Sequence, residues 1–185
     1  MINYPSDIYE RTKLYLRVME EIKYRIKYLN ENLDSLSGAG VKYEVCTLQL
    51  RHICELIAMS CIVSQGDFTT YKSLNKEYSP SKIFYTLEKL NRDFFPVDVV
   101  IKRESDQIFY ARGNNKKSIS RIELQSLWSR SGDALHRASL NKFLRNVTIP
   151  KTHFDKIVKD RDSIVELMKS HSIKTIDSNL WIHAV

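Results

Sequence analysis

The sequence predicts a mainly α-helical bundle of about five helices, with a small antiparallel β-hairpin inserted in it. Three observations favour this fold class: long stretches with apolar residues at helical spacing, turn residues at the ends of several of these stretches, and one pair of short β-rich runs. The chain has 185 residues, of which 43% are hydrophobic and 28% charged. This size and balance suit a single globular domain over residues 1–185.

The first helix is predicted over residues 7–36. Ser6 is a suitable N-cap, and Gly38 and Gly40 should end the helix. Steps of four and three residues separate the apolar positions Tyr15, Met19, Ile22, Ile26, Leu29, Leu33 and Leu36. This seam would also suit a coiled-coil dimer, but in a single domain it favours packing inside the bundle.

The second helix, predicted over 43–65, has a wide apolar face and should form the centre of the core. Its three cysteines lack the spacing of a zinc site and are expected to be reduced core thiols. Arg51 and Glu55 are four residues apart on this helix. They form either an ordinary surface ion pair or the support of a functional site.

The middle of the chain predicts a short helix and then a hairpin. Residues 69–78 should form a short helix or turn, and Ser79-Pro80 is typical of a helix start, here for a helix over 80–93. Two β-rich runs follow at 97–103 and 107–112, separated by polar residues. This arrangement predicts two antiparallel strands.

Two further helices and a strand complete the prediction. Ser120 and Glu123 form a capping-box pattern at the start of a helix over 121–146, in which Gly132 is expected to cause a bend. Residues 153–170 should form the last helix, and 180–184 a strand that joins the hairpin. The segment 153–185 would then be an appendage to the bundle.

The net charge of +7 comes from one part of the chain. Residues 102–151 contain 11 basic and four acidic residues, whereas the segments before and after are neutral. A basic block of this kind favours a polyanionic partner such as RNA, although a solvated surface without a partner would have the same composition. The chain lacks the glycine-rich phosphate loops and the serine-hydrolase elbow. No secretory signal or long uninterrupted apolar run is present, so a cytoplasmic protein without a membrane partner is expected.

One motif in the basic block resembles that of a known family. The stretch Arg130-Ser-Gly-Asp-Ala-Leu-His136 resembles the R-x(4–6)-H motif of HEPN domains, although Ser131 stands where many members have Asn, Asp or His. The stretch Leu50–Glu55 also looks like the second helix of some phage-defence members. The resemblance covers roughly residues 7–146 and implies a helical bundle with the motif on a late helix.

The resemblance implies a metal-independent endoribonuclease that needs no cofactor and acts as a homodimer. It implies that Arg130 holds the scissile phosphate and that His136 transfers protons at the ribose 2′-hydroxyl or the leaving oxygen. Asp133 and Arg137 would support this pair, Arg137 through a phosphate contact. The basic residues expected to contact RNA are Lys116, Lys117, Arg121, Lys142 and Arg145. A toxin or phage-defence effector, with an inhibitory protein partner, fits this picture.

Two alternatives remain open at this stage. The chain could be a catalytically silent module of the same shape that binds RNA or a protein. Locally, Asp133 could simply cap the following helical segment and pair with Arg137 four residues later, with His136 at the surface.

Overall fold

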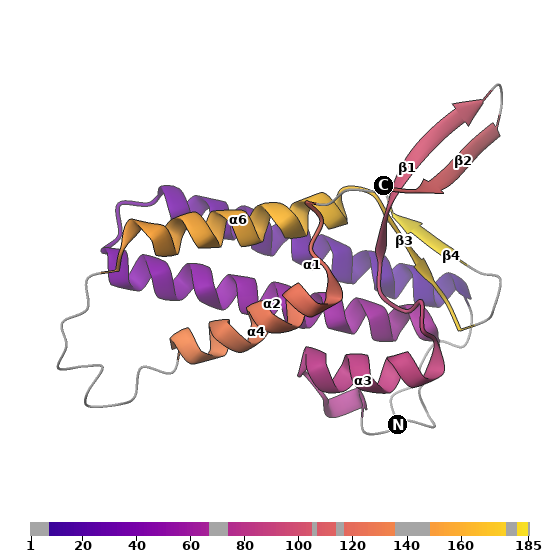
Figure 1. Cartoon of the computed structure of the whole chain (residues 1–185), viewed down its shortest axis with the longest axis horizontal. Coiled ribbons are helices and arrows are strands. Elements are labelled where there is room, and N and C mark those ends of the chain that lie inside the picture. The colour runs from indigo at the N-terminus through magenta and orange to yellow at the C-terminus, as the bar shows by residue number, and fades with distance from the viewer. Residues whose placement is uncertain are drawn as a thin grey trace.

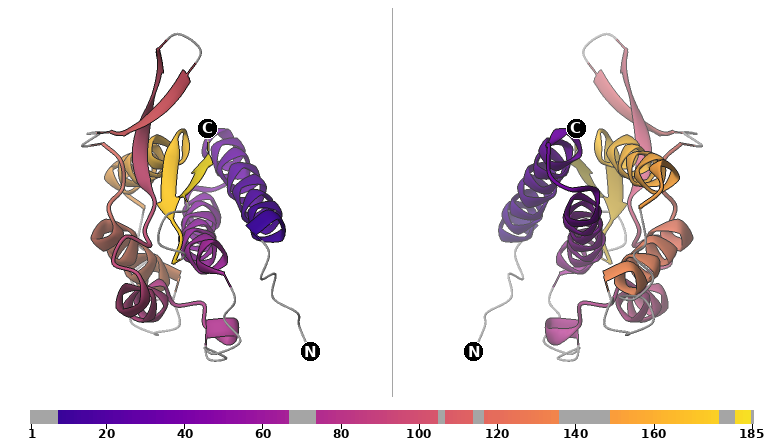
Figure 2. Two further views of the ribbon diagram at one scale, coloured as in Figure 1. Left: turned by 90° about the vertical axis from the view of Figure 1, so that its right-hand side faces the viewer. Right: turned by 90° about the vertical axis from the view of Figure 1, so that its left-hand side faces the viewer.

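One long helix, over residues 39–65, lies at the centre of the protein and contacts the other α-helices. The computed structural model describes residues 8–66, 74–104, 107–113, 117–135, 149–176 and 181–184. Its elements, in chain order, are α1 (Ile8–Asp34), α2 (Ala39–Gln65), η2 (Leu74–Lys76), α3 (Pro80–Leu90), β1 (Val97–Glu104), β2 (Gln107–Arg112), α4 (Arg121–Leu135), α6 (Lys151–Met168), β3 (His171–Lys174) and β4 (Trp181–Ala184). Helix α2 lies between α1 on one side and α3 with α4 on the other, and α6 packs alongside (Figures 1 and 2). The predicted mainly helical fold with a small antiparallel sheet is confirmed.

Helix α2 supplies the centre of the core, as predicted. Ile53 and Ile57 are fully buried, and so are the three free cysteines Cys46, Cys54 and Cys61. Burial raises the pKa of the Cys46 thiol to about 11 and raises the pKa of the other two thiols as well, so these side chains act as apolar filling.

Among the described helices, α2 is the one that is long and apolar enough to cross a membrane by length and composition alone. In this fold, however, 56% of that apolar window is buried inside the protein. Contacts with α1, α3, α4 and α6 therefore account for the apolar character of α2.

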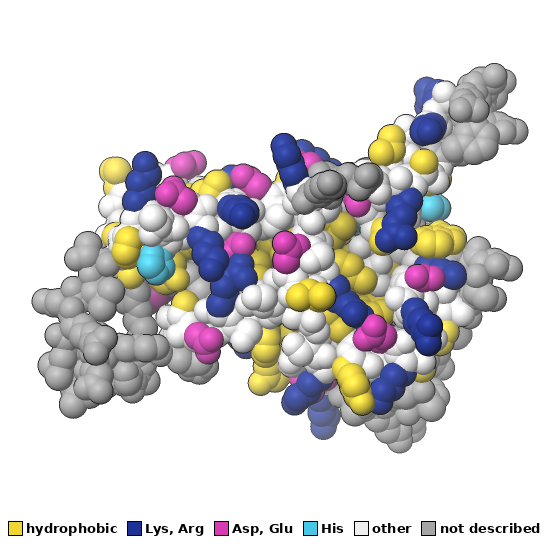
Figure 3. All heavy atoms as spheres, in the orientation of Figure 1, with side chains coloured by type: hydrophobic (Ala, Val, Ile, Leu, Met, Phe, Trp, Pro, Cys, Tyr) yellow, Lys and Arg dark blue, Asp and Glu magenta, His cyan; other side chains and the backbone are white. Residues whose placement is uncertain are grey.

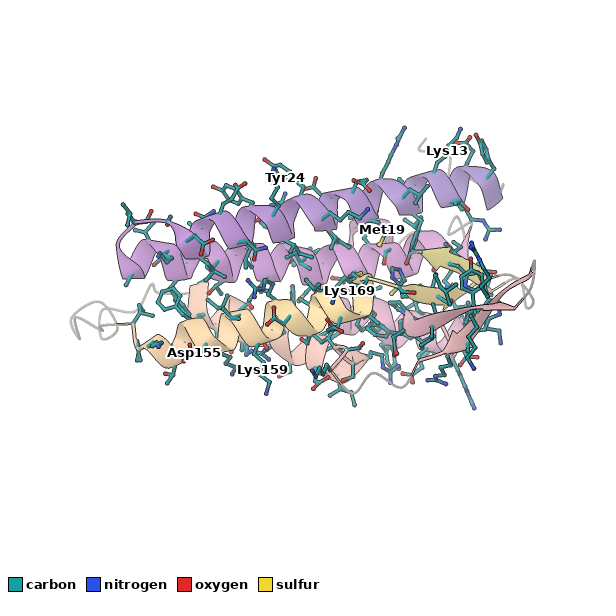
Figure 4. The ribbon with its side chains drawn as sticks, turned by 90° about the horizontal axis from the view of Figure 1, so that it is seen from above. Lys13, Met19, Tyr24, Asp155, Lys159 and Lys169 are labelled. Carbon is teal, nitrogen blue, oxygen red and sulfur yellow. The ribbon has the colours of Figure 1, made fainter. Side chains whose placement is uncertain are left out.

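Helix α1 follows its predicted seam for almost its whole length. Tyr15, Met19 and Ile22 are buried, and Met19 lies between α1 and α2, whereas Lys13 and Tyr24 point away from the bundle (Figure 4). The last seam position, Leu36, is fully exposed, so its assignment to the core is wrong. The helix ends at Asp34 because the backbone N–H and the hydroxyl of Ser35 both donate to the carbonyl of Asn32 and turn the chain there.

Two helix boundaries differ from the predictions by three or more residues. Helix α2 begins at Ala39, four residues early, because the Lys42 N–H donates to the carbonyl of Gly38 and closes a first turn that includes Gly40. Helix α3 ends at Leu90, where Asn91 takes an extended conformation. Helix α4 continues unbroken through Gly132 to Leu135, and residues 136–146 of the predicted helix lie outside the described residues.

The sheet has four antiparallel strands in the order β2-β1-β3-β4. The hairpin β1–β2 forms as predicted and projects beyond the helices (Figure 1). The C-terminal strand β4 does not join the hairpin directly. It pairs with β3, which the sequence did not predict, and β3 pairs with β1 through Val97 opposite Ser172.

The two faces of the β3–β4 pair differ sharply. Ile173 pairs with Ile182, and both are buried against the helices. On this core face the Tyr15 hydroxyl and His171 Nε2 lie 2.6 Å apart in a fully buried hydrogen bond. Because side chains alternate along a strand, Trp181 and His183 lie on the opposite face, and both are exposed.

Candidate functional site

Four of the predicted site residues lie in the described part of the chain: Lys117, Arg121, Arg130 and Asp133. The other five lie outside it: Lys116, His136, Arg137, Lys142 and Arg145. The candidate site is therefore built from helix α4, which contains Arg130, and from the elements that pack against it.

The start of α4 is fixed by the capping box that the sequence predicts. The Ser120 backbone N–H donates to Glu123 Oε2 over 2.8 Å, and the Glu123 N–H donates back to Ser120 Oγ over 3.3 Å. Hydrogen bonds from the Ser120 side chain and backbone lower the pKa of the Glu123 carboxyl. These two hydrogen bonds give partners to backbone N–H groups that have none within the helix at its start.

The middle of α4 is held to α2 by a polar cluster of Arg51, Glu55 and Trp128. Arg51 Nη1 donates to the Trp128 carbonyl over 3.2 Å, and its guanidinium lies 4.3 Å from the centroid of the Trp128 ring. Glu55 Oε1 accepts from Trp128 Nε1 over 2.9 Å and lies 3.3 Å from Arg51 Nε. Arg51 and Glu55 thus pair with each other, as their spacing suggested, and together hold α4 against α2.

The position of Arg51 in this cluster explains why residue 132 is a glycine. A Cβ at position 132 would lie 2.5 Å from Arg51 Nη1, so a larger side chain would displace the guanidinium. The glycine allows the close approach of Arg51 to α4, and the helix is continuous at this position.

Arg130 points from α4 toward α6. Its Nη2 lies 2.6 Å from Asp160 Oδ1, and its Nη1 lies 3.4 Å from Ser126 Oγ. The guanidinium side chain is 32% exposed and the Asp160 side chain 17%. A guanidinium has five N–H donors, so these two contacts orient Arg130 and, among the described residues, leave three donors for a ligand.

A cavity of about 410 Å³ opens beside Arg130, between α2, α4 and α6. Its charged and titratable lining consists of Arg130, His153, Lys156 and Asp160, with Tyr43 also at its wall. The His153 ring packs edge-on against Tyr43 at 5.5 Å between centroids. Thr47 Oγ1 faces this region from α2; it is buried, and no hydrogen-bond partner for it lies in the described part of the chain.

A longer groove runs from the same residues along α6. Lys117 and Glu123 line it on one side, and Asp155 and Lys159 line it on the α6 side, where Figure 4 shows them. Basic and acidic side chains alternate over this face of the molecule (Figure 3). The groove therefore has a mixed charge.

The basic block of the sequence does not gather at one place in the described structure. Arg121, at the start of α4, forms an ion pair with Glu88 at 2.8 Å. Arg130 lies nine residues further, which is about 13 Å along a helix axis. Asp133 is exposed near the C-terminal end of α4.

Sequence reasoning missed His153, Lys156 and Asp160 as neighbours of Arg130. They belong to α6, more than 20 residues later in the chain, and only the packing of α6 against α4 brings them together. The basic residues close to His153 in sequence were a weak signal for this site.

No protein family, curated protein or solved structure matches this chain. In the described ranges, no group of three or more His, Cys, Asp or Glu side chains is arranged to hold a metal ion.

Proposed function

We propose that this protein is a metal-independent endoribonuclease of the HEPN type, with its cleavage site at the cavity between α2, α4 and α6. The observation that carries the proposal is that Arg130, Lys156 and His153 line one cavity. Cationic groups can stabilise the charge that develops on a phosphate, and an imidazole can transfer the protons of ribose-assisted RNA cleavage. The cavity volume is also in the range of small-ligand sites.

In this mechanism the ribose 2′-hydroxyl attacks the adjacent phosphorus. A base removes the 2′-proton, the bond from phosphorus to the 5′-oxygen breaks, and an acid protonates that leaving oxygen. The products are a 2′,3′-cyclic phosphate and a free 5′-hydroxyl. DNA, which lacks the 2′-hydroxyl, is not cleaved.

Arg130 would hold the phosphate and stabilise the negative charge that develops on it. Asp160 and Ser126 orient its guanidinium, and the remaining N–H groups are available to the phosphate. Lys156, on the same cavity wall, adds a second positive charge.

Two histidines are candidates for proton transfer, because histidine is the side chain that titrates near neutral pH. His153 lines the cavity. His136, predicted from the motif, follows α4 one residue after the last described position. Pairing of two protomers, which the resemblance implies, would bring two such sets into one cleft.

A fluorescent single-stranded RNA, incubated with the protein in EDTA, tests the proposal and assigns the histidine. The alanine variant of the proton-transferring histidine, His136→Ala or His153→Ala, should cut about 10²–10⁴ times more slowly than wild type. His52→Ala is the matched control, because His52 is half-exposed, pairs with Glu55 and does not line the cavity. Cleavage within threefold of wild type by both histidine variants, about 0.7 kcal/mol at the transition state, would contradict the proposal.

The ion pair of Arg130 with Asp160 favours a second candidate function, a catalytically silent module that binds RNA or a protein. In that case Asp160 neutralises Arg130 permanently and the cavity is not a reaction centre. The same experiment separates the two functions. RNA that is bound but never cut by wild type supports the module and contradicts the enzyme.

A further inference from the structure

A second concave surface lies at the other end of the molecule, where the outer face of the sheet meets the end of α3 and the start of α4. Its cavity has a volume of about 730 Å³. The residues that give it its character are Arg92, Arg112, Arg121, Tyr110, Trp181 and His183. We call this surface the sheet groove. Figure 3 shows Lys and Arg side chains around hydrophobic ones in this area, below the hairpin.

The strand register places the aromatic and basic groups on one face. Tyr110 and Arg112 are two residues apart on β2, and Trp181 and His183 are two residues apart on β4, so each pair shares a face. Ser172 of β3 pairs with Val97 of β1 on one side and with His183 of β4 on the other, and Val99, two residues after Val97 on β1, pairs with Arg112 of β2. Ile182, between Trp181 and His183, is buried on the opposite face.

The aromatic side chains form a surface suited to stacking. The rings of Tyr110 and His183 are stacked, with centroids 3.9 Å apart and planes 7° apart, although β1 and β3 lie between their strands. A hydrogen bond between Nδ1 of His183 and Oγ of Ser172 fixes the orientation of the His183 ring. Tyr110 is still 41% exposed and Trp181 44% exposed.

The charge of the sheet groove is positive. Its two carboxylates are neutralised in place, because Glu88 pairs with Arg121 at 2.8 Å and Asp93 pairs with Lys174 at 3.3 Å. Arg92 and Arg112 are exposed and remain as the net charge of the surface. An anionic ligand is therefore favoured over a cationic or neutral one.

We propose that the sheet groove binds single-stranded RNA, with unpaired bases stacked on Trp181 and on the Tyr110–His183 pair, and with phosphates on Arg92 and Arg112. Exposed aromatic rings beside arginines recognise single strands, because a duplex hides the faces of its bases. This inference rests on the proposed function in taking RNA as the ligand. It adds a substrate-positioning surface: helix α4 runs from Arg121 at this groove to Arg130 at the cavity, about 13 Å along its axis.

The test measures binding of a fluorescent single-stranded RNA with 2′-O-methyl riboses, which lacks the 2′-hydroxyl nucleophile and cannot be cut. Trp181→Ala and Tyr110→Ala should each weaken binding about 5- to 100-fold, which corresponds to the loss of one stacked base. Trp181→Phe should keep most of the affinity. Tyr24→Ala is the control, since Tyr24 is also an exposed aromatic residue but lies on the outer side of α1 (Figure 4).

The salt dependence of RNA binding tests the phosphate contacts separately. Arg112→Ala should reduce the slope of log affinity against log salt concentration by about 0.7, the value for one phosphate contact on a single strand. Arg17→Ala, an exposed arginine of α1, should leave the slope unchanged. A duplex of the same sequence should bind more weakly than the single strand.

Binding by Trp181→Ala and Tyr110→Ala within about twofold of wild type, or equal affinity for duplex and single strand, would overturn the inference. So would a wild-type protein that binds no RNA at this groove but binds an acidic protein there. Because the RNA used is not cleavable, a failure of the cleavage proposal leaves this binding result unaffected, and the two proposals can fail separately.

Discussion

The two sides of helix α2 are built in different ways. Toward α1 most of the contact is apolar: Ile22 of α1 and Ile53 and Ile57 of α2 are buried in one apolar core, with the Arg25–Gln49 hydrogen bond beside it. Toward α4 and α6 the contact includes the Arg51–Glu55–Trp128 cluster, the Arg130–Asp160 pair and a cavity. An apolar interface gives stability without chemistry, whereas oriented charged groups beside a cavity can bind and react. The difference locates the candidate site on the α4–α6 side.

The largest expected effect on stability lies on the apolar side. Ile57→Ala should lower the free energy of unfolding by about 2–5 kcal/mol, because Ile57 is fully buried and the change leaves a cavity. Urea unfolding measures the loss. Met59→Ala, at a half-exposed position of the same helix, should cost much less. A loss below about 1 kcal/mol for Ile57→Ala would mean that this interface is not the core.

A pH effect should appear at the buried hydrogen bond between Tyr15 of α1 and His171. Burial lowers the pKa of His171 to about 4, well below the value near 6.5 of an unfolded chain. Between these values the unfolded state binds more protons than the folded state, so stability falls as pH decreases from about 6.5 to 4. The loss from this group should be about 3 kcal/mol. His171→Gln should remove this part of the pH dependence, and an unchanged profile in that variant would contradict the assignment.

The polar cluster on the α4 side should contribute less than the core. Glu55→Ala removes the acceptor of Trp128 Nε1 and the partner of Arg51, and should cost about 1–3 kcal/mol. The exposed pair Glu20–Lys23 on α1 is the comparison, and Glu20→Ala should cost less than about 1 kcal/mol. Equal losses at the two positions, measured by urea unfolding, would show that the cluster does not fasten α4 to α2.

The smallest effect on stability should come from Arg130. Its ion pair with Asp160 is partly exposed, so Arg130→Ala should change the free energy of unfolding by less than about 1 kcal/mol. A larger loss of unfolding free energy would mean that Arg130 is a structural residue. The α4–α6 side of α2 would then contribute to stability in the same way as the apolar side.

Local patterns made most of the helices predictable. The seam of α1, the capping box of Ser120 and Glu123, and Pro80 at the start of α3 each depend on residues within a few positions of one another. Strand β3 was not predictable, because its four residues show no strand pattern of their own and are ordered by pairing with β1 and β4.

The candidate site was predictable only in part. The motif pointed to Arg130, and helical spacing pointed to the ion pair of Arg51 with Glu55, but not to their contacts with Trp128. The contacts that define the cavity join α4 to α6, and no local pattern indicates which face of α6 meets Arg130. The same applies to the sheet groove, where register across four strands brings Tyr110 to His183.

The central claim is that the guanidinium of Arg130 stabilises the transition state of RNA cleavage in the cavity. Its most direct test is the single-turnover rate of cleavage of a fluorescent RNA in EDTA by wild type and by Arg130→Ala, with circular dichroism to confirm an intact fold. The account predicts a rate at least about 10²-fold lower for the variant. A folded Arg130→Ala protein that cleaves within threefold of the wild-type rate would contradict it.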